Sequence, residues 1–207
     1  MKIDTNLNDM LSAIDVPADW VGIREVYEAK TPRMIRDGVP VSNGHYSTHG
    51  IMIEVLVNGQ FGYYGTPNIS KKGVEFAAKN AYKQASIASD YSVHKFTDKV
   101  RPKSVGSYSS PYVKDVKSIS PKELNMLLLN AYKNLKVSDK IVSASSLANT
   151  IETNFHFISS NGSDVVQEFL MLEFDLSALV MLSTPVYLLR SSLIELKAFL
   201  HFCQDGL

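Results

Sequence analysis

The sequence predicts an α+β fold: a mixed or antiparallel sheet with an alanine-rich helix packed on it, followed by a second unit of helix and strands. Three observations support this prediction. A hairpin signal lies at Asn58-Gly59, an alanine stripe begins after Ser70, and the elements follow the order helix, strands, helix, linker, helix, strands. That order does not suit a doubly wound sheet, in which strands and helices alternate regularly.

The first ninety residues supply most of the predicted sheet. A short helix is expected over 5–14, where apolar residues recur at helical spacing. Residues 20–27 and 32–37 are expected to form two separate strands, with Asp37-Gly38 as a turn. Apolar residues then alternate over 50–57 and lead into Asn58-Gly59. Asn-Gly between β-rich runs predicts a type I′ hairpin, because both central residues of that turn need a positive φ.

An alanine-rich helix is predicted to open at Asn68-Ile69-Ser70. Its small residues form one stripe with a period of 3.6: Val74, Ala77, Ala78, Ala81, Ala85 and Ala88. Such a stripe lets a helix lie close against a sheet. Core packing is therefore favoured over the alternative, a face that binds a partner.

The second half of the chain begins with a change of character. Residues 91–121 lack periodicity and are interpreted as a linker or an extended surface segment. A capping box with proline at its first helical position, Ser120-Pro121-Lys122-Glu123, then predicts another helix. Two or three strands are expected, over 140–145, 150–158 and 165 to about 174, with a turn at 160–163.

Composition excludes several classes of protein. The 207 residues include 21 Lys+Arg and 21 Asp+Glu, so zero net charge gives no electrostatic footprint for nucleic acid or an anionic membrane. The single cysteine, Cys203, cannot form a disulfide within the chain, which fits a reducing, cytoplasmic compartment. The longest charge-free run in the apolar C-terminal stretch, 176–189, falls short of the roughly 20 residues that a membrane span needs.

No histidine lies in a recognisable metal motif. The five histidines are His45, His49, His94, His156 and His201. None is followed by glutamate, so neither HExxH nor HExxxH occurs. His45 and His49 are four residues apart, a spacing that converges on a metal only in a helix, whereas Gly44 and Gly50 place them at a strand entrance. Exposed loop histidines are the favoured interpretation.

Nucleophile and phosphate motifs are also missing, so no catalytic, cofactor-binding or metal residue is assigned. The sequence has no G-x-S-x-G elbow, and Cys203 and His201 are spaced so that their side chains point apart. The glycines of Gly59-x-x-Gly62-x-x-Gly65 have the wrong spacing for a dinucleotide loop and are expected to let the hairpin turn and twist. The basic, tyrosine-containing segment 95–122 is interpreted as a solvated linker rather than a nucleic-acid contact.

Several local motifs together resemble the TldD/PmbA family, the modulators of DNA gyrase now regarded as metallopeptidases. Residues 19–90 are similar to the family's first module, through DWVGIREVYEAKTPRMIRDGVP and THGIMIEVLVNGQFGYYGTPNISKKGVEFAAKNAYKQA. The shared positions are Asp37-Gly38, Gly50, Asn58-Gly59-x-x-Gly62 and Thr66-x-Asn68-x-Ser70. Residues 110–165 resemble the start of the second module, up to the turn Ser159-Ser160-Asn161-Gly162.

The resemblance implies a non-catalytic, N-terminal part of a metallopeptidase subunit. The family's HExxxH-type metal site lies beyond the matched region, so zinc would be bound by residues that this chain lacks, and the chain is predicted to be inactive alone. The resemblance further implies a homodimer or a pair with a related subunit, and an enclosed chamber that admits unfolded peptide. The alternative is a stand-alone peptide- or protein-binding module without peptidase activity.

The predicted organisation has four parts. Residues 1–95 form the first module, 96–120 a linker, 121–176 the start of the second module, and 177–207 an atypical apolar tail. The tail does not resemble the family's continuation. A gene truncated or frame-shifted before the metal site is one hypothesis for it.

Overall fold

The computed structural model describes residues 5–112, 118–181 and 186–194. The helices are α1 (Leu7–Ser12), α2 (Lys71–Asp90) and α3 (Pro121–Leu135), with a 3-10 turn, η1, at Asp98–Val100. The strands are β1 (Trp20–Arg36), β2 (Val39–Asn43), β3 (Tyr46–Val57), β4 (Gln60–Thr66), β5 (Val105–Ser109), β6 (Ile141–Ser159), β7 (Asp164–Met181) and β8 (Val186–Ile194).

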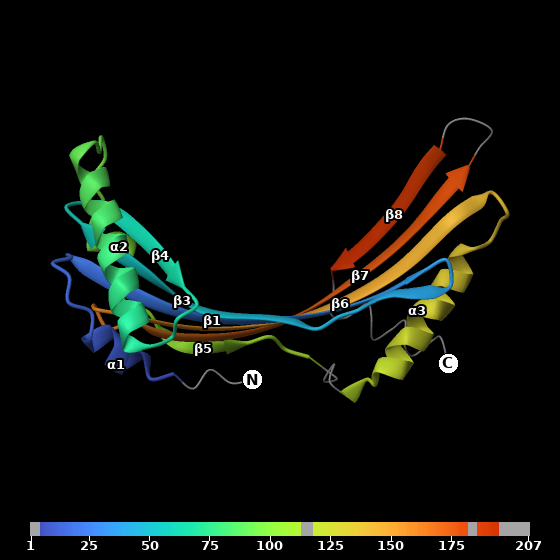
Figure 1. The fold of residues 1–207 in the computed structure, drawn as a ribbon, viewed down its shortest axis with the longest axis horizontal. Coiled ribbons are helices and arrows are strands. Elements are labelled where there is room, and N and C mark those ends of the chain that lie inside the picture. The colour runs from blue at the N-terminus through green and yellow to red at the C-terminus, as the bar shows by residue number, and fades with distance from the viewer. Residues whose placement is uncertain (1–4, 113–117, 182–185, 195–207) are drawn as a thin grey trace. The chain divides into compact units, whose positions relative to one another are not determined.

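These strands form a mixed sheet, as the sequence predicts. The order is β4-β3-β1-β6-β7-β5, with β2 beside β1 and β8 beside β7 (Figure 1). β5 runs parallel to β7, whereas β2, β4 and β8 are antiparallel to β1, β3 and β7. The predicted α+β class is therefore confirmed.

Contacts divide the described chain into two units that share the long strands. Unit 1 contains residues 5–28, Thr48–Ser109 and Thr153–Glu168, and unit 2 contains the described parts of Ala29–Ser47, Ser110–Glu152 and Phe169–Leu207. The four-part linear division stays a prediction.

Both predicted two-residue turns are confirmed. Asn58 and Gly59 have φ values of 49° and 83°, and they link Val57 to Gln60 across the β3–β4 hairpin. Asp37 and Gly38, between β1 and β2, have φ values of 50° and 81°. Positive φ at both central positions is the signature of the type I′ turn, whose twist matches that of the flanking strands.

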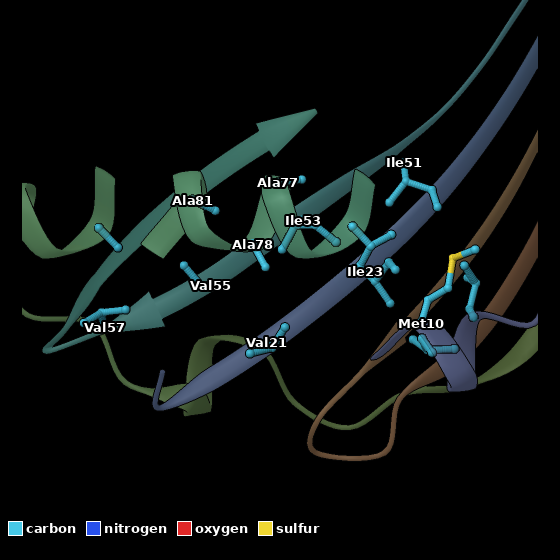
Figure 2. Packing of buried hydrophobic residues seen from close by; sticks show 14 residues of the cluster. Met10, Val21, Ile23, Ile51, Ile53, Val55, Val57, Ala77, Ala78 and Ala81 are labelled. Atoms are coloured by element: carbon cyan, nitrogen blue, oxygen red, sulfur yellow. The ribbon is translucent and has the colours of Figure 1, made fainter. Parts of the chain in front are cut away.

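The core of unit 1 lies between the sheet and helices α1 and α2. Figure 2 shows Val21 and Ile23 of β1 and the apolar face of β3 against the alanines of α2. Val74, Ala77, Ala78, Ala81 and Ala85 are buried, which confirms the predicted packing face at these positions, whereas Ala88, also predicted there, is exposed. A Cβ at Gly62 would lie 2.0 Å from the Ala81 carbonyl oxygen, which shows how closely α2 approaches β4.

The core of unit 2 forms around α3. Ser120 accepts a hydrogen bond from the Glu123 amide while the Glu123 side chain accepts one from the Ser120 amide, so the predicted capping box is confirmed. Leu128 of α3 packs with Ile35 of β1 and Ala148 of β6. The helix therefore buries its apolar stripe against strands from both halves of the sequence.

In two places the sequence predicts two short strands where the structure has one long strand, so both predictions were wrong. Residues 20–27 and 32–37 belong to one strand, β1, and residues 140–145 and 150–158 belong to another, β6. In β1, Pro32 lacks an N–H, but its carbonyl oxygen still accepts a bond from Gly44, so pairing continues past it. In β6, which lies between β1 and β7 in the sheet, Ser146 lies in the expected gap and donates to the Leu128 carbonyl of α3.

The C-terminal stretch continues the sheet as far as it is described. β7 extends to Met181, and β8 pairs with it from Met181↔Val186 to Glu173↔Ile194. Cys203 and His201 lie outside the described residues. Among the helices that the structure describes, none has the length and hydropathy of a membrane span.

Candidate functional site

A cavity lies on the face of the unit 1 sheet that α2 does not cover. Val21 and Ile23 of β1 point into the α2 core, so the alternating residues Trp20 and Arg24 occupy the opposite face. Glu54 of β3 lies on that face for the same reason. The cavity has a volume of about 450 Å³. It is lined by Trp20, Arg24, Glu54, Val100, Arg101, Pro102, Ser104, Phe155, Phe157, Ser163, Val165 and Gln167.

The segment after α2 is held beside this cavity by hydrogen bonds to two turns. Phe96 N–H donates to the Gly59 carbonyl (2.9 Å) in the β3–β4 turn. Asn161, in the β6–β7 turn, donates through Nδ2 to the Arg101 carbonyl (2.7 Å), and Ser104 N–H donates to Ser163 Oγ (3.1 Å). The segment expected to be a solvated linker is thus attached to unit 1, and it continues into β5.

An ion pair fixes this segment to the sheet. Arg101 donates from Nε (3.0 Å) and Nη2 (2.5 Å) to Oε1 of Glu54, whose residue is 5% exposed. The hydrogen bond to Glu54 is the main cause that raises the pKa of Arg101. Burial, followed by the Glu54 charge, raises the pKa of neighbouring Tyr63. Arg101 Cζ also lies 4.8 Å from the centre of the Phe61 ring.

Aromatic rings form the floor of the cavity. Trp20 lies 6.2 Å from Phe61 and 6.4 Å from Phe157, measured between ring centroids. A Cβ at Gly22 would lie 2.5 Å from the Trp20 ring and 3.0 Å from Phe157, so glycine is required for this packing. Trp20 Nε1 is buried and has no hydrogen-bond partner among the described residues.

Arg24 lies against the same floor. Its Cζ is 5.6 Å from the centre of the Phe157 ring, a cation–π contact, and the residue is half-buried. Among the described residues it has no carboxylate partner. The cavity therefore combines an aromatic surface with a guanidinium whose charge is not paired, a chemistry suited to binding an anion.

The two histidines considered for a metal have separate partners. His45 Nδ1 lies 3.0 Å from Thr31 Oγ1, and His49 Nε2 lies 2.8 Å from Oε1 of Glu25. Glu25 is fully buried, and Thr5 donates a second hydrogen bond to the same oxygen (2.6 Å). Its other oxygen has no partner among the described residues.

The zinc site implied by the family resemblance finds no donor set in the described part of the chain. Nowhere in it do three or more His, Cys, Asp or Glu side chains gather as a metal site requires. His156, for example, contacts Asp164 alone at 3.0 Å (Nε2 to Oδ1). The described residues therefore do not fit zinc.

Sequence reasoning missed the residues that build the cavity. Arg101 was grouped with a mobile basic segment, and its partner is 47 positions away in the chain. A signal was present, because Glu54 interrupts an apolar run and a buried carboxylate requires a partner. Of the three glycines expected to let the hairpin turn and twist, Gly59 occupies the turn, whereas Gly62 lies close against α2, a packing role that the sequence reasoning did not include.

Comparisons with known proteins agree with this fold. The family model described as PmbA/TldA metallopeptidase domain 1 matches residues 21–85. No curated protein matches the sequence. A putative modulator of DNA gyrase from Bacteroides thetaiotaomicron shares the fold with a TM-score of 0.70 at 17% identity, over 95% of this chain and 48% of that one.

Two further solved structures are similar. A putative modulator of a DNA gyrase from Thermotoga maritima gives a TM-score of 0.60 at 14% identity, over 84% of this chain and 39% of that chain. TldE from Thermococcus kodakarensis gives a TM-score of 0.57 at 16% identity, over 92% of this chain and 42% of that chain. The chain thus spans less than half the length of each. The resemblance read from the sequence is confirmed over residues 21–85, which match the first domain of the PmbA/TldD family, and the chain shares its fold with these three solved structures.

Proposed function

We propose that this chain acts as the N-terminal, non-catalytic region of a PmbA/TldD-like metallopeptidase subunit. In this role it contributes to the assembly of a dimer and to the enclosure of an unfolded peptide substrate. The partner is a second copy or a related subunit, and zinc is supplied by residues outside this chain. The proposal places the protein in the cytoplasm, because its one cysteine fits a reducing compartment.

One observation carries the proposal. The match to the first metallopeptidase domain over 21–85 covers β1 to β4 and most of α2, while the fold likeness extends over 95% of the chain. The likeness of fold therefore extends over both units. The described residues, however, contain no group of side chains that could hold a metal. A scaffold role accounts for both facts.

Zinc content and peptidase activity test the proposal together. The purified chain is expected to bind no stoichiometric zinc and to leave denatured casein intact. An intact full-length family member is then added, and it should form a mixed complex, seen by light scattering, that cleaves casein. A full-length member whose own HExxxH motif has been inactivated should give no activity. Stoichiometric zinc and proteolysis by the chain alone would refute a non-catalytic role, and absence of any complex would refute the assembly role.

A second candidate function is a stand-alone module that binds peptides or proteins. It is favoured by β5, which ends the main strand order and whose five residues are all exposed. An edge strand of this kind can accept an added strand from a partner. Binding of unfolded peptide by the chain alone, without complex formation with family members, would favour this module over the scaffold.

A further inference from the structure

The cavity of unit 1 carries a charge that the described residues do not balance. Two guanidinium groups, those of Arg24 and Arg101, line it together with one carboxylate, that of Glu54. Arg101 donates two hydrogen bonds to Glu54, and both end on its Oε1. Arg24 lies over the face of Phe157 and has no carboxylate partner among the described residues. The cavity therefore has an excess of one positive charge, at a half-buried position where water screens charge less than it does at the open surface.

Polar groups without partners lie around the same space. The indole Nε1 of Trp20 is buried and unpartnered among the described residues, although a buried donor normally has an acceptor. Gln167 also lines the cavity, and its side-chain amide makes no hydrogen bond to the described residues. Arg24 and the side-chain amide of Gln167 are donors that an oxygen-rich anion in the cavity would satisfy.

The remaining walls are apolar and aromatic. The apolar lining residues are Trp20, Phe155, Phe157, Val100, Pro102 and Val165. The volume of about 450 Å³ lies within the range of small-ligand sites, roughly 300–1,000 Å³. A ligand that fits would combine one negative charge with an apolar or aromatic group.

We propose that this cavity is a binding site for a monocarboxylate attached to an apolar or aromatic group, such as the C-terminal residue of a peptide. The Arg24 guanidinium pairs with the carboxylate, in the planar geometry that suits two parallel hydrogen bonds. The rings of Trp20 and Phe157 contact the apolar group. The Arg101–Glu54 pair keeps the wall at residues 100–104 in place. This assigns a ligand site to unit 1 itself, which goes beyond the scaffold role.

The chain provides its own probe for a test. Trp20 is the only tryptophan in the sequence, so intrinsic fluorescence reports on this cavity wall alone. The full chain is titrated with N-acetyl-phenylalanine and, as a matched ligand without the charge, with N-acetyl-phenylalanine amide. The carboxylate is expected to change the Trp20 emission and to bind about tenfold or more tightly than the amide, as one charge-assisted contact implies.

Variants locate the charge contact. Arg24→Gln should weaken carboxylate binding about tenfold and leave amide binding unchanged. Arg36→Gln, which removes an exposed charge from the same strand, should bind both ligands as the native chain does. Circular dichroism checks that each variant folds. Equal affinity for carboxylate and amide in the native chain would overturn the proposal without reference to any variant, and so would unchanged binding in folded R24Q.

The source of the carboxylate is tested separately. The probe is a tripeptide, N-acetyl-Gly-Gly-Phe with a free C-terminus. If the ligand is the end of a peptide, the tripeptide binds more tightly than N-acetyl-phenylalanine. If the ligand is a small free carboxylate, the two bind equally tightly. Both results support the site. If none of these ligands binds, the scaffold proposal still stands, because its test measures complex formation and casein cleavage with a full-length member and not Trp20 emission.

Discussion

Arg101 and Glu54, 47 residues apart, meet through two hydrogen bonds that end on a single carboxylate oxygen, Oε1. Glu54 comes from the middle of β3, and Arg101 from the segment that follows η1. The pair connects a stretch with almost no regular structure to the unit 1 sheet. Together with the hydrogen bonds of Phe96, Asn161 and Ser104, it holds that stretch beside the cavity.

Replacing Arg101 should destabilise unit 1. In Arg101→Met the aliphatic stem is kept, but the Glu54 carboxylate remains buried without its cation. Loss of one partner from a fully buried pair costs about 3–5 kcal/mol, and the Arg101 side chain is 38% exposed, so we expect about 2 kcal/mol from urea unfolding. Glu54→Gln combined with Arg101→Met should cost less than the sum of the two single changes.

The matched control for this experiment is Lys99→Met. Lys99 belongs to η1 and is exposed, with no described partner, so its loss should change the free energy of unfolding by less than about 0.5 kcal/mol. Equal losses in R101M and K99M would show that the ion pair does not anchor the segment.

Asp37 should make the stability of unit 2 depend on acid pH. Its carboxylate accepts hydrogen bonds from the Ala144 amide (2.9 Å) and the Ser143 hydroxyl (3.0 Å). The bond from Ala144 is the main cause that lowers the pKa of Asp37 below its usual value of 3.8. A depressed pKa contributes stability above the unfolded value, and this contribution is lost as the pH falls through the folded value.

The test is Asp37→Asn, because asparagine tolerates the positive φ of this turn. At pH 7 the native chain should unfold at higher urea than D37N, and the difference should shrink as the pH falls below about 3.8 and the native carboxylate becomes protonated. Asp139→Asn, which removes an exposed carboxylate without a described hydrogen bond, serves as control. A D37N deficit that persists unchanged at pH 2 would contradict the assignment.

Local signals in the sequence predicted local structure well. Asn58-Gly59 and the capping box at Ser120 depend on neighbours within a few residues, so their chemistry is readable from the chain alone. The alanine face of α2 was also predictable, because a helical period repeats itself along the sequence.

Features set by distant contacts were not predictable. The break expected between the strands 20–27 and 32–37 did not occur: β1 is continuous, and the Pro32 carbonyl is paired with the Gly44 amide. β5 carries no strand pattern of its own and is defined by its parallel register with β7, in which Val105 lies opposite Asp164. The cavity likewise depends on Arg101 reaching Glu54. In each case tertiary contacts outweigh local propensity.

Gly62 should be irreplaceable, because it faces α2 at very short range. In Gly62→Ala the new Cβ would lie 2.0 Å from the Ala81 carbonyl oxygen and 2.8 Å from the Ala85 nitrogen, both backbone atoms that a rotamer change cannot move. The helix must shift away from β4, and overpacking of this kind costs about 1–3 kcal/mol. Urea unfolding followed by circular dichroism measures the loss.

Gly65, three residues along the same strand, provides the control. A Cβ there would meet nothing within 4 Å, so Gly65→Ala should change stability by less than about 0.5 kcal/mol. If the two variants unfold at the same urea concentration, the close approach of α2 to β4 at Gly62 is refuted.

His49 should matter to stability where His45 does not. Glu25 is fully buried, and its Oε1 depends on His49 and Thr5, while its Oε2 has no described partner. His49→Ala removes one of these contacts and leaves the carboxylate under-satisfied, at a cost of about 1–3 kcal/mol. His45→Ala removes only a bond to Thr31 at an exposed position and should cost less than about 0.5 kcal/mol.

A third variant separates hydrogen bonding from packing, because His49 also lies edge-on to the Tyr27 ring at 5.7 Å. His49→Gln keeps a donor near Glu25 and loses the ring contact, so it should recover part of the stability lost in H49A. Equal losses in H49Q and H49A would assign the effect to the Tyr27 contact, and equal stability of H45A and H49A would show that the Glu25 bond contributes nothing measurable.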